Sequence, residues 1–575
     1  MSKDGKPSAN EGIKDRSNFL RGTIAEGLQD LSTGGLSGDD QQLIKFHGSY
    51  QQDDRDLRAA RRKHKLEKAY SFMIRIRVPG GVSTPQQWIE MDRMASQFGN
   101  ETFKLTTRQA YQLHGVIKTN LKRTIKEINA TAMDTIAACG DVNRNVMCNT
   151  NPDASALHGE VLRLSQEISA HLTPATGAYH EIWLDGEKVD SEKKGEEPIY
   201  GKCYLPRKFK IAVAIPPNND VDVYANDLSF IAIVSGKKLA GFNVAVGGGM
   251  GMSHGQEDTY PRVADVIGFV TPDKVVEVAE KVVIVQRDHG DRSNRKHARL
   301  KYTIDDHGVD WFRGQVEEGL GYRLEEAREF SFSENGDRFG WFENEDGSSN
   351  YTFYVPGGRV LDTASTKQRS GFLEIAKCMA GEFRLTGNQN LTIARISKVE
   401  RPQVEALIKK FELDRHAQLS GLRLNSISCV ALPTCGLALA EAERYLPNLI
   451  DELEEVIEGS GLRHDAITIR MTGCPNGCAR PYIAEIAFVG RAPGKYNVYL
   501  GGGFVGDRLS KLWRASVKSD EIKALLKPVI EEYAKARNDG ERFGDFVIRK
   551  GYVKATSNGL DFHTDVVPPE PATKG

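Results

Sequence analysis

The sequence repeats a set of motifs after about 280 residues, and this repeat constrains the fold more than any other feature. The strand-like SFMIRIRVPGG ends at Gly81, and YTFYVPGG ends at Gly358, 277 positions later. TFKLTTRQAYQL at 102–113 matches EFRLTGNQNLTI at 382–393, at an offset of 280. Because both the order and the offset are kept, the repeat predicts duplication of a whole module. Coincidence among common strand and turn sequences is the alternative.

Two further pairs of segments extend the repeat and indicate the fold class. Cys148 in NRNVMC aligns with Cys429 in NSISC at an offset of 281, and NVAVGGGM at 243–250 resembles NVYLGGGF at 497–504. Each half begins with β-rich segments, continues with a helical stretch and returns to strands without a strict βαβ order. This mixture predicts an α+β fold, and 575 residues exceed a single hydrophobic core. We expect the two halves to face each other across a pseudo-two-fold axis, with a site at the seam.

Four cysteines of the second half have the spacing of metal ligands. Cys429 and Cys435 lie six positions apart in SCVALPTC, and Cys474 and Cys478 lie four apart in TGCPNGC. Four thiolates in two loops suit an iron–sulfur cluster, which needs soft anionic ligands from separate segments. The neighbouring prolines and glycines favour tight turns whose amides can point at cluster sulfurs. Zinc and unrelated free cysteines are the alternatives, although zinc sites favour shorter spacings.

Basic residues stand in the first half, which lacks this set of cysteines. Strand alternation places Arg75 and Arg77 on one face of FMIRIRV, and Lys208 and Lys210 on one face of LPRKFKIAV. A single residue of this kind is usually a solvated charge on a strand. Six of them in the half opposite a predicted cluster indicate an anion-binding site instead; they are Arg75, Arg77, Arg108, Arg144, Lys208 and Lys210.

Composition and the absence of certain motifs restrict the partners. A formal net charge of −1 gives no electrostatic case for nucleic acid or a membrane surface, although a local basic site is compatible with a neutral total. No apolar run approaches the ~20 residues that span a bilayer, and the N-terminus has no secretory apolar region. We therefore expect a protein of the reducing cytoplasm, with thiols available to metals. The other four cysteines are expected to be small buried side chains: Cys139, Cys148, Cys203 and Cys378.

Taken together, the motifs resemble the siroheme-containing sulfite and nitrite reductases, and more narrowly the sulfite reductase hemoproteins. TGCPNGC, SCVALPTC, VNRNVMC, LPRKFK and FGDF stand where that family has them. The cysteine signature is shared with the nitrite reductases, whereas LPRKFK and KFHGSYQQDDRD favour the sulfite branch. The resemblance runs from about residue 40 to about residue 552. It implies a three-domain fold with these segments: a partly disordered N-terminal arm (1–65), two ferredoxin-like half-domains (66–138 and 341–412), a first siroheme-binding α/β lobe (139–340) and a second lobe with the cluster (413–575).

The resemblance implies two cofactors, a [4Fe–4S] cluster and siroheme. Cys429, Cys435, Cys474 and Cys478 would bind the cluster, and Cys478 would also bridge it to the siroheme iron. Siroheme carries eight carboxylates, so its pocket must be cationic. The residues implied for siroheme binding are Lys104, Arg108, Gln112, His114, Arg207, Asn476 and Cys478. The residues implied for catalysis are Arg75, Arg144, Lys208 and Lys210, which would bind the sulfite oxygens and place protons.

The function that follows is the six-electron reduction of sulfite to sulfide for sulfur assimilation. A siroheme nitrite reductase is the first alternative, with Lys210 as the discriminating residue, and nitrite is expected as a side substrate. A non-enzymatic redox sensor with an iron–sulfur or zinc site is the second alternative. The glycine runs at 247–251 and 501–503 fit no nucleotide-binding motif. We therefore expect electrons from a separate NADPH-dependent flavoprotein or from ferredoxin.

Overall fold

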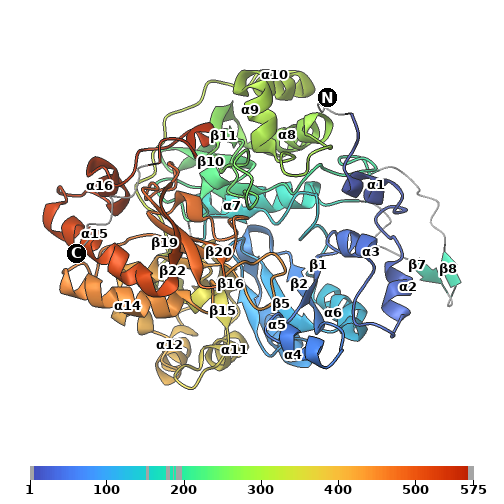
Figure 1. Ribbon diagram of the computed structural model, residues 1–575, viewed down its shortest axis with the longest axis horizontal. Coiled ribbons are helices and arrows are strands. Elements are labelled where there is room, and N and C mark those ends of the chain that lie inside the picture. Colours follow the sequence, from blue (N-terminus) through green and yellow to red (C-terminus); the bar gives the residue numbers. More distant parts are fainter. Residues whose placement is uncertain (1–4, 151–154, 176–181, 185–186, 190–196, 567–575) are drawn as a thin grey trace.

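The fold contains two pairs of matching sheets, in keeping with the predicted duplication (Figure 1). The computed structural model describes residues 5–150, 155–175, 182–184, 187–189 and 197–566. Within these ranges, four five-stranded sheets and one two-stranded hairpin, β7 (Ile182–Leu184) with β8 (Glu187–Val189), are present. None of the described helices is long and apolar enough to cross a membrane.

The first pair of sheets exchanges a short strand between the two halves of the chain. The first sheet has the order β1-β2-β5-β4-β15, and the second has the order β13-β14-β17-β16-β3. Strand β15 of the second half therefore pairs with β4 of the first, and β3 of the first pairs with β16 of the second. This reciprocal exchange is what a pseudo-two-fold axis produces. The strands are β1 (Ser49–Asp53), β2 (Tyr70–Ile76), β3 (Val82–Ser83), β4 (Phe103–Leu105), β5 (Tyr111–Val116), β13 (Gly340–Glu343), β14 (Ser349–Phe353), β15 (Arg359–Val360), β16 (Glu382–Leu385) and β17 (Leu391–Ile396).

One hydrophobic core joins these two sheets. Helix α5 (Pro85–Gln97) starts with a capping box between Thr84 and Gln87, and its counterpart is α11 (Gln368–Cys378). Trp88 of α5 is fully buried, and its ring lies 5.1 Å from that of Phe103 and 4.8 Å from that of Phe383. Because these rings come from both halves, neither half-domain has a closed core without the other. The remaining helices of this region are α6 (Lys118–Ala130) and α12 (Arg401–Lys410).

The second pair of sheets forms the centres of two lobes with the same topology. The orders are β6-β9-β10-β11-β12 and β18-β19-β20-β21-β22. In both sheets the first three strands are parallel and the last two are antiparallel. The strands are β6 (Met147–Cys148), β9 (Ile211–Ala214), β10 (Leu228–Ser235), β11 (Lys238–Val246), β12 (Asp265–Val270), β18 (Ser426–Ser428), β19 (Ile469–Thr472), β20 (Ile486–Ala492), β21 (Lys495–Leu500) and β22 (Lys511–Lys518).

Helices cover these lobe sheets. The helix α14 (Leu446–Gly459) buries Leu449, Leu453 and Ile457 at helical spacing against the second lobe sheet, as its amphipathic sequence predicts. In Figure 1 the first-lobe helices α8, α9 and α10 lie at the top and α14, α15 and α16 at the left. The other helices of the lobes are α7 (Ala156–His171), α8 (Val275–His289), α9 (Leu300–His307), α10 (Val309–Leu320), α13 (Gly421–Leu424), α15 (Ile522–Ala536) and α16 (Phe543–Arg549).

The N-terminal arm is more ordered than the sequence suggests. Within the described residues it forms α1 (Ala9–Asp15), α2 (Ile24–Gln29), α3 (Gly38–Leu43), β1 and α4 (Arg58–Lys63). Lys14 is buried, donates to the carbonyl of Leu205 at 2.9 Å and lies 3.7 Å from Asp141. The expectation of partial disorder therefore does not fit residues 5–65, because a buried lysine needs fixed acceptors. The arm packs on the loop that carries the predicted substrate lysines.

A buried ion pair crosses the seam between the lobes. Asp222 lies just before β10, and Arg480 lies just before β20. The two residues are 258 positions apart, which is also the distance in sequence between the equivalent strands β10 and β20. Both residues have left-handed backbone conformations, with φ of 49° and 52°. Their side chains form an ion pair, and Arg470 also binds Asp222 at 2.6 Å. Residues at equivalent positions of the repeat therefore contact each other, as only residues close to a pseudo-two-fold axis can.

Candidate functional site

The four predicted cluster cysteines lie at one edge of the second lobe sheet. Cys429 directly follows β18, with Cys435 further along the same loop, and Cys474 and Cys478 lie in the loop after β19. Strands β18 and β19 are parallel neighbours, so the two loops leave the sheet at the same end. A backbone hydrogen bond holds the two cysteine loops together, because the N–H of Leu439 donates to the carbonyl of Gly473 at 2.7 Å.

The thiols of this group influence one another electrostatically. Burial, together with the charge of the nearby Cys478, raises the pKa of Cys474 to about 12. Burial and the charge of Cys478 likewise raise the pKa values of Cys429 and Cys435. A group of thiols that resists ionisation in this way needs a bound metal to become a set of thiolates.

A zinc ion and an iron–sulfur cluster would hold these thiols at different distances from one another. Tetrahedral zinc with Zn–S bonds of about 2.3 Å would bring its sulfurs to within about 4 Å of one another. Among the described residues, no three His, Cys, Asp or Glu side chains are arranged to hold a single metal ion in this way. An iron–sulfur cluster places each thiolate on a different iron, so its ligands stand further apart.

Hydrogen-bond donors point at two of the sulfurs. The N–H of Gly473 donates to Sγ of Cys429 at 3.3 Å, and Nδ2 of Asn476 lies 3.5 Å from Sγ of Cys474. Donors of this kind stabilise a thiolate and tune a cluster. The structure thus brings the predicted Asn476 into the cysteine group, and the donor set fits an iron–sulfur cluster.

Cys478 is the point where the two halves of the chain meet. Its side chain is exposed, unlike that of Cys474, and its carbonyl accepts a hydrogen bond from Oγ1 of Thr107 in the first half at 3.0 Å. Its charge also acts on the predicted substrate residues Lys208 and Lys210 of the first half. The cysteines of one half and the cations of the other therefore form a single site.

The cations of the first half crowd together around this cysteine. Burial lowers the pKa of Lys208 to about 7, and the charges of Arg207 and Arg299 contribute. The pKa of Lys210 lies well below its ordinary value because of burial and the charge of Lys208. Within the described part of the chain, neither ammonium group has a hydrogen bond or a salt bridge. Half-buried lysines of this kind stay charged at neutral pH only beside an anion, which fits a polycarboxylate cofactor and an anionic substrate.

Arg108 and His114 present buried polar atoms that lack partners. Arg108 donates to Asn226 at 2.8 Å and to the carbonyl of Ile211 at 2.6 Å, but its Nε has no partner among the described residues. Burial lowers the pKa of Arg108 to about 9. Nδ1 of His114 is also buried without a partner in the described residues. Unpaired buried polar atoms next to several cations indicate a binding site for a polar ligand.

Arg75 is held from both sides. Its Nη1 donates to Sγ of Cys139 at 3.2 Å, and its Nη2 donates to Oε1 of Gln112 at 3.1 Å. Nε2 of Gln112 in turn lies 2.7 Å from Nε2 of His114. Because β2 pairs with β5, Arg75 and Gln112 are direct cross-strand partners. The predicted residues Arg75, Gln112 and His114 thus form one hydrogen-bonded chain.

The other three predicted residues have partners within the protein. The guanidinium of Arg144 donates to the carbonyl of Gly140 at 2.9 Å, and Arg207 lies 3.9 Å from Asp141. Lys104 is buried, and its Nζ lies 2.5 Å from a carboxylate oxygen of Glu443. The ammonium group of Lys104 is already paired with Glu443, so this arrangement does not favour a direct contact between Lys104 and siroheme. That contact stays a prediction.

Three residues near the site are absent from the sequence predictions. Arg299 binds Asp227 in a bidentate ion pair of 2.9 and 2.7 Å, and its charge lowers the pKa values of Lys208 and Lys210. Lys301 is fully buried, and its partners among the described residues are backbone carbonyls, including that of Gly251 at 2.7 Å. The sequence signal for both is the basic run NRKHARLK, which starts at residue 294. Tyr50 has its pKa raised by burial and by the charge of Cys139, and its signal is the motif KFHGSYQQDDRD.

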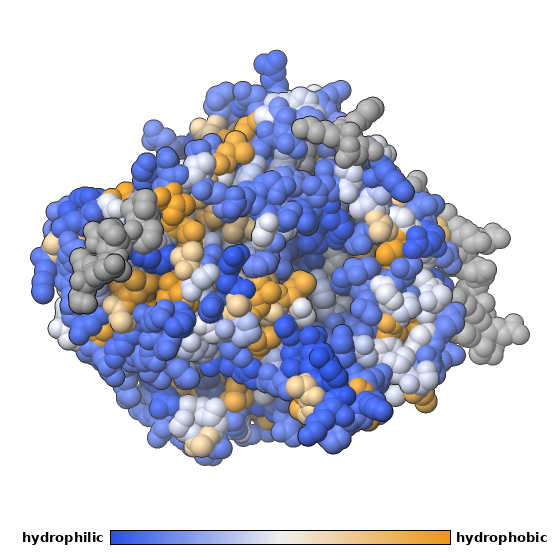
Figure 2. Space-filling view, in the orientation of Figure 1, coloured by the Kyte–Doolittle hydropathy of each residue, from blue (hydrophilic) through white to orange (hydrophobic). Residues whose placement is uncertain are grey.

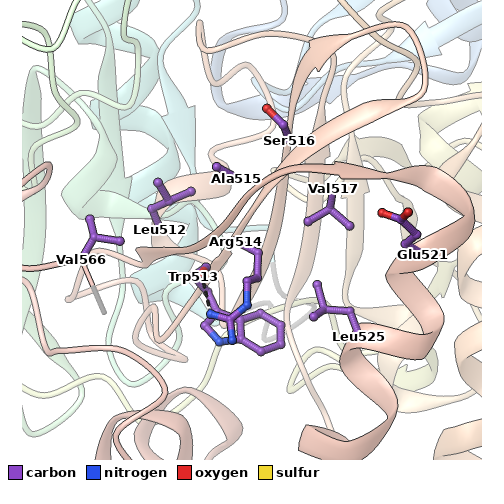
Figure 3. Close-up of a pocket in the computed structure, with 9 residues that line it drawn as sticks. All are labelled: Leu512, Trp513, Arg514, Ala515, Ser516, Val517, Glu521, Leu525 and Val566. Atoms are coloured by element: carbon purple, nitrogen blue, oxygen red, sulfur yellow. Dashed lines mark hydrogen bonds between the residues drawn. The ribbon is translucent and has the colours of Figure 1, made fainter. Parts of the chain in front are cut away.

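A separate cavity lies away from this site. A space of about 600 Å³ runs along β22, and Figure 3 shows Trp513, Leu525 and Val566 around it. Nη1 of Arg514 donates to the carbonyl of Trp513, and its guanidinium lies 4.6 Å from the Trp513 ring. Its lining contains none of the predicted site residues, so it is not part of the cysteine and cation site.

Comparison with known proteins identifies the family. The family described as "Nitrite and sulphite reductase 4Fe-4S domain" matches residues 164–324 and 423–558. The family described as "Nitrite/Sulfite reductase ferredoxin-like half domain" matches residues 64–131 and 343–411. The chain belongs to the nitrite and sulphite reductase family. Each model matches once in each half, which confirms the duplicated fold predicted from the repeat.

Its relatives in this family cover nearly the whole chain. The protein named "Sulfite reductase [NADPH] hemoprotein beta-component" from Paenibacillus sp. (strain JDR-2) is 58% identical, over 97% of this chain and 98% of its own. A protein of the same name from Oceanobacillus iheyensis is 56% identical, over 98% of this chain and 98% of its own. Another from Geobacillus kaustophilus is 58% identical, over 97% of this chain and 98% of its own. The solved structure of the Mycobacterium tuberculosis NirA protein superposes with a TM-score of 0.77 at 26% identity, over 95% of this chain and 97% of that one. The cofactors of this reductase family are the [4Fe–4S] cluster and siroheme, as predicted.

Proposed function

We propose that this chain is the hemoprotein of an assimilatory sulfite reductase, which reduces sulfite to sulfide with six electrons. The observation that supports this most directly is the meeting of two sets of residues at Cys478. Four cysteines of the second half and the lysines and arginines of the first half converge there, with Thr107 holding the Cys478 carbonyl. A cluster site beside an anion pocket suits electron delivery to an anionic oxidant.

The residues present fit both cofactors. Cys429, Cys435, Cys474 and Cys478 would hold the cluster, with Gly473 and Asn476 donating to its sulfurs. The orphaned atoms of Arg108 and His114, with Gln112 and Arg207 nearby, would receive the siroheme carboxylates. When bound, the cluster and siroheme store electrons and pass them to the substrate.

The residues Arg75, Arg144, Lys208 and Lys210 would bind and protonate the substrate. Sulfite is a dianion, and its conversion to sulfide and three water molecules consumes protons as well as electrons. A lysine whose pKa has been lowered to about 7 gives up a proton more readily than an arginine, whose guanidinium rarely deprotonates. We therefore assign proton delivery to Lys208 and Lys210, and orientation of the sulfite oxygens to Arg75 and Arg144.

The electron donor would be a separate protein. The relatives carry [NADPH] in their names, and this sequence contains no nucleotide-binding motif. An NADPH-dependent flavoprotein is therefore the proposed partner, with ferredoxin as the alternative, and the cytoplasm is the proposed location.

The decisive experiment measures turnover with a chemical electron donor. Purified protein supplied with a reduced viologen dye is expected to convert sulfite to sulfide, and to reduce nitrite with a lower kcat/KM. Higher kcat/KM on nitrite would make the chain a nitrite reductase. A protein that lacks the visible absorption of a heme and reduces neither anion would instead support the redox-sensor alternative.

A further inference from the structure

The glycine run at 247–251, which fits no nucleotide-binding motif, brings the backbone of the first lobe into close contact with other backbone. The run directly follows β11. Gly247 has a φ of 86°, and a Cβ on Gly248 would overlap the carbonyl of Tyr224. Both positions therefore require glycine, because a side chain would be strained at the first and would not fit at the second.

The end of this run contacts the second half of the chain at the TGCPNGC motif. The N–H of Met252 donates to the carbonyl of Pro475 at 2.9 Å. A Cβ on Gly477 would lie 2.7 Å from the carbonyl oxygen of Met250, so the two backbones touch. Both contacts fall between the two cysteines of the motif. Residues 249–252, here called the contact loop, thus lie directly against the segment that carries two cluster ligands.

Lys301 holds the contact loop from the side of the first lobe. Its Nζ donates to the carbonyls of Gly249 at 3.2 Å, of Gly251 at 2.7 Å and of Tyr260. The Nζ also lies 4.7 Å from the centre of the Tyr302 ring. The three N–H groups of an ammonium match the three carbonyls. Burial lowers the pKa of Lys301 well below its ordinary value, and a neutral amine would still donate to two of the three carbonyls.

The complete burial of this lysine is unusual for its residue type. Hydrophilic residues dominate the face of the molecule in Figure 2, as expected for lysines and other charged side chains. Lys301 is 0% exposed. Burying an amine is unfavourable unless it has hydrogen-bond acceptors, and here the acceptors are backbone carbonyls of one loop and its neighbour. The side chain therefore serves to fix that backbone.

The second lobe uses its own glycine run in a related way. Gly501 has the same φ of 86° as Gly247. The side-chain amide of Asn219 in the first half donates to the carbonyl of Val505, just after this run, at 2.7 Å. Each lobe thus places the loop after its glycine run against the other half. In the first lobe the loop meets the cluster ligands.

We propose that Lys301 is a positioning residue for the cluster, which acts through the contact loop on the segment between Cys474 and Cys478. Groups that surround a metal ligand orient it and tune the metal, and their loss typically weakens metal binding by about 10- to 100-fold. Without Lys301, the carbonyls of the contact loop would lose their fixed donor, and the loop would no longer hold the cysteine segment in place. The proposal rests on the cluster of this family and not on the anion that the enzyme reduces.

The test compares Lys301→Met with Lys118→Met in the holoenzyme. Lys118 is the matched control, because it is also buried and also donates to backbone carbonyls, those of Asp30 and, at 3.1 Å, of Gly35 in the arm. Iron released into a coloured chelator complex is followed while far-ultraviolet circular dichroism shows that the protein stays folded. Lys301→Met is expected to release cluster iron about 10- to 100-fold faster than wild type, and Lys118→Met within about twofold of it. The electron paramagnetic resonance spectrum of the reduced cluster should change in Lys301→Met alone.

A second variant tests the contact loop with Lys301 in place. In Gly251→Ala the added carbon would lie 3.3 Å from the carbonyl oxygen of Asn476, which is closer than ordinary contact. Its control is Gly314→Ala on α10, where nothing lies within 4 Å of the added carbon. Gly251→Ala is expected to release iron faster than wild type by more than about twofold, and Gly314→Ala to match wild type.

The outcomes separate this proposal from the proposed function. Iron release at the wild-type rate in Lys301→Met, or equal acceleration in Lys301→Met and Lys118→Met, would overturn the positioning role. If Lys301→Met does not fold, Gly251→Ala decides, and an unchanged rate and spectrum in that variant would overturn the proposal as well. A wild-type protein that fails to reduce sulfite with a viologen dye would defeat the proposed function and leave the iron-release test unaffected.

Discussion

Glu443 connects the cluster loop to both ferredoxin-like half-domains, and its replacement by glutamine is the sharpest test of how the site is built. Its carboxylate binds Nζ of Lys104 at 2.5 Å and Nε of Arg359 at 2.7 Å. Lys104 lies on β4 and Arg359 on β15, the strand exchanged from the other half. The N–H of Glu443 donates to the carbonyl of Cys429 at 3.1 Å. One side chain therefore joins the exchanged strands to a cluster ligand.

The size of this contribution follows from the pKa of Glu443. Burial alone would raise that pKa, but Lys104 and Arg359 outweigh it and hold the pKa at about 2, against an ordinary value of 4.5. At about 1.4 kcal/mol for each pH unit, this lowering corresponds to about 3 kcal/mol of folding free energy. Because the folded-state pKa is depressed, the contribution is complete above pH 4.5 and is lost as the pH falls towards 2. Breaking a buried pair by removing one partner costs a similar amount, about 3–5 kcal/mol.

The assay is urea unfolding of wild type and Glu443→Gln, with matched cofactor content, at pH 7 and at a series of lower pH values. We expect the variant to be less stable by about 3 kcal/mol at pH 7, with the difference closing between pH 4.5 and 2. Glu441→Gln is the matched control, because Glu441 pairs with the half-exposed Arg444 on the same loop and should cost at most about 1 kcal/mol. A loss below 1 kcal/mol for Glu443→Gln, or a loss that persists unchanged at low pH, would refute the reasoning.

Three further predictions follow from the site and the arm. Lys210→Asn should keep both cofactors and slow sulfite reduction by roughly 10- to 150-fold, because one charged hydrogen bond contributes ~1.5–3 kcal/mol. Nitrite reduction should be slowed less, and equal losses in kcat/KM for the two anions would contradict the discriminating role of Lys210. Cys474→Ser should lose the cluster, seen as loss of the iron that wild type binds, and stoichiometric zinc in wild type would argue against the cluster. Lys14→Met should destabilise the first lobe by about 2 kcal/mol in urea unfolding and lower dye-driven turnover, because Lys14 holds the loop at Leu205; unchanged values of both would show that the arm does not support the site.

The fold and the cluster could be predicted from the sequence because their signals are local or periodic. The offset of the PGG turns survives in the structure as two equivalent turns in which Gly80 and Gly357 have φ of 66° and 55°. Such backbone conformations favour glycine, so the duplicated motif is also a duplicated geometry. The cysteine spacing is likewise set by two short loops after adjacent parallel strands.

Long-range ion pairs could not be predicted in the same way. The ion-pair partner of Lys104, Glu443, is 339 positions away and leaves no local pattern in the sequence. Arg299 meets Asp227 across 72 positions, and it lies in a basic run that looks like a solvated surface. The order of the arm rests on buried long-range contacts, such as those of Lys14 with Leu205 and Asp141, which composition does not reveal. Contacts of this kind are decided by the packing of whole lobes.

The equivalent positions of the two halves show why the chain has one site of this kind rather than two. The N–H of Lys210 donates to the carboxylate of Asp227, and at the matching place the N–H of Thr468 donates to Glu485.

The frame is therefore the same, but its side chains differ. Arg75 hydrogen bonds to Gln112 across β2 and β5, whereas Thr352 and Thr392 occupy the matching positions of β14 and β17. The cations stand only in the first set of these positions and the cluster cysteines only in the second half. A polyanionic cofactor can therefore bind next to the cluster at the seam where Cys478 meets the first half. Each half supplies only part of this site, so each is incomplete without the other.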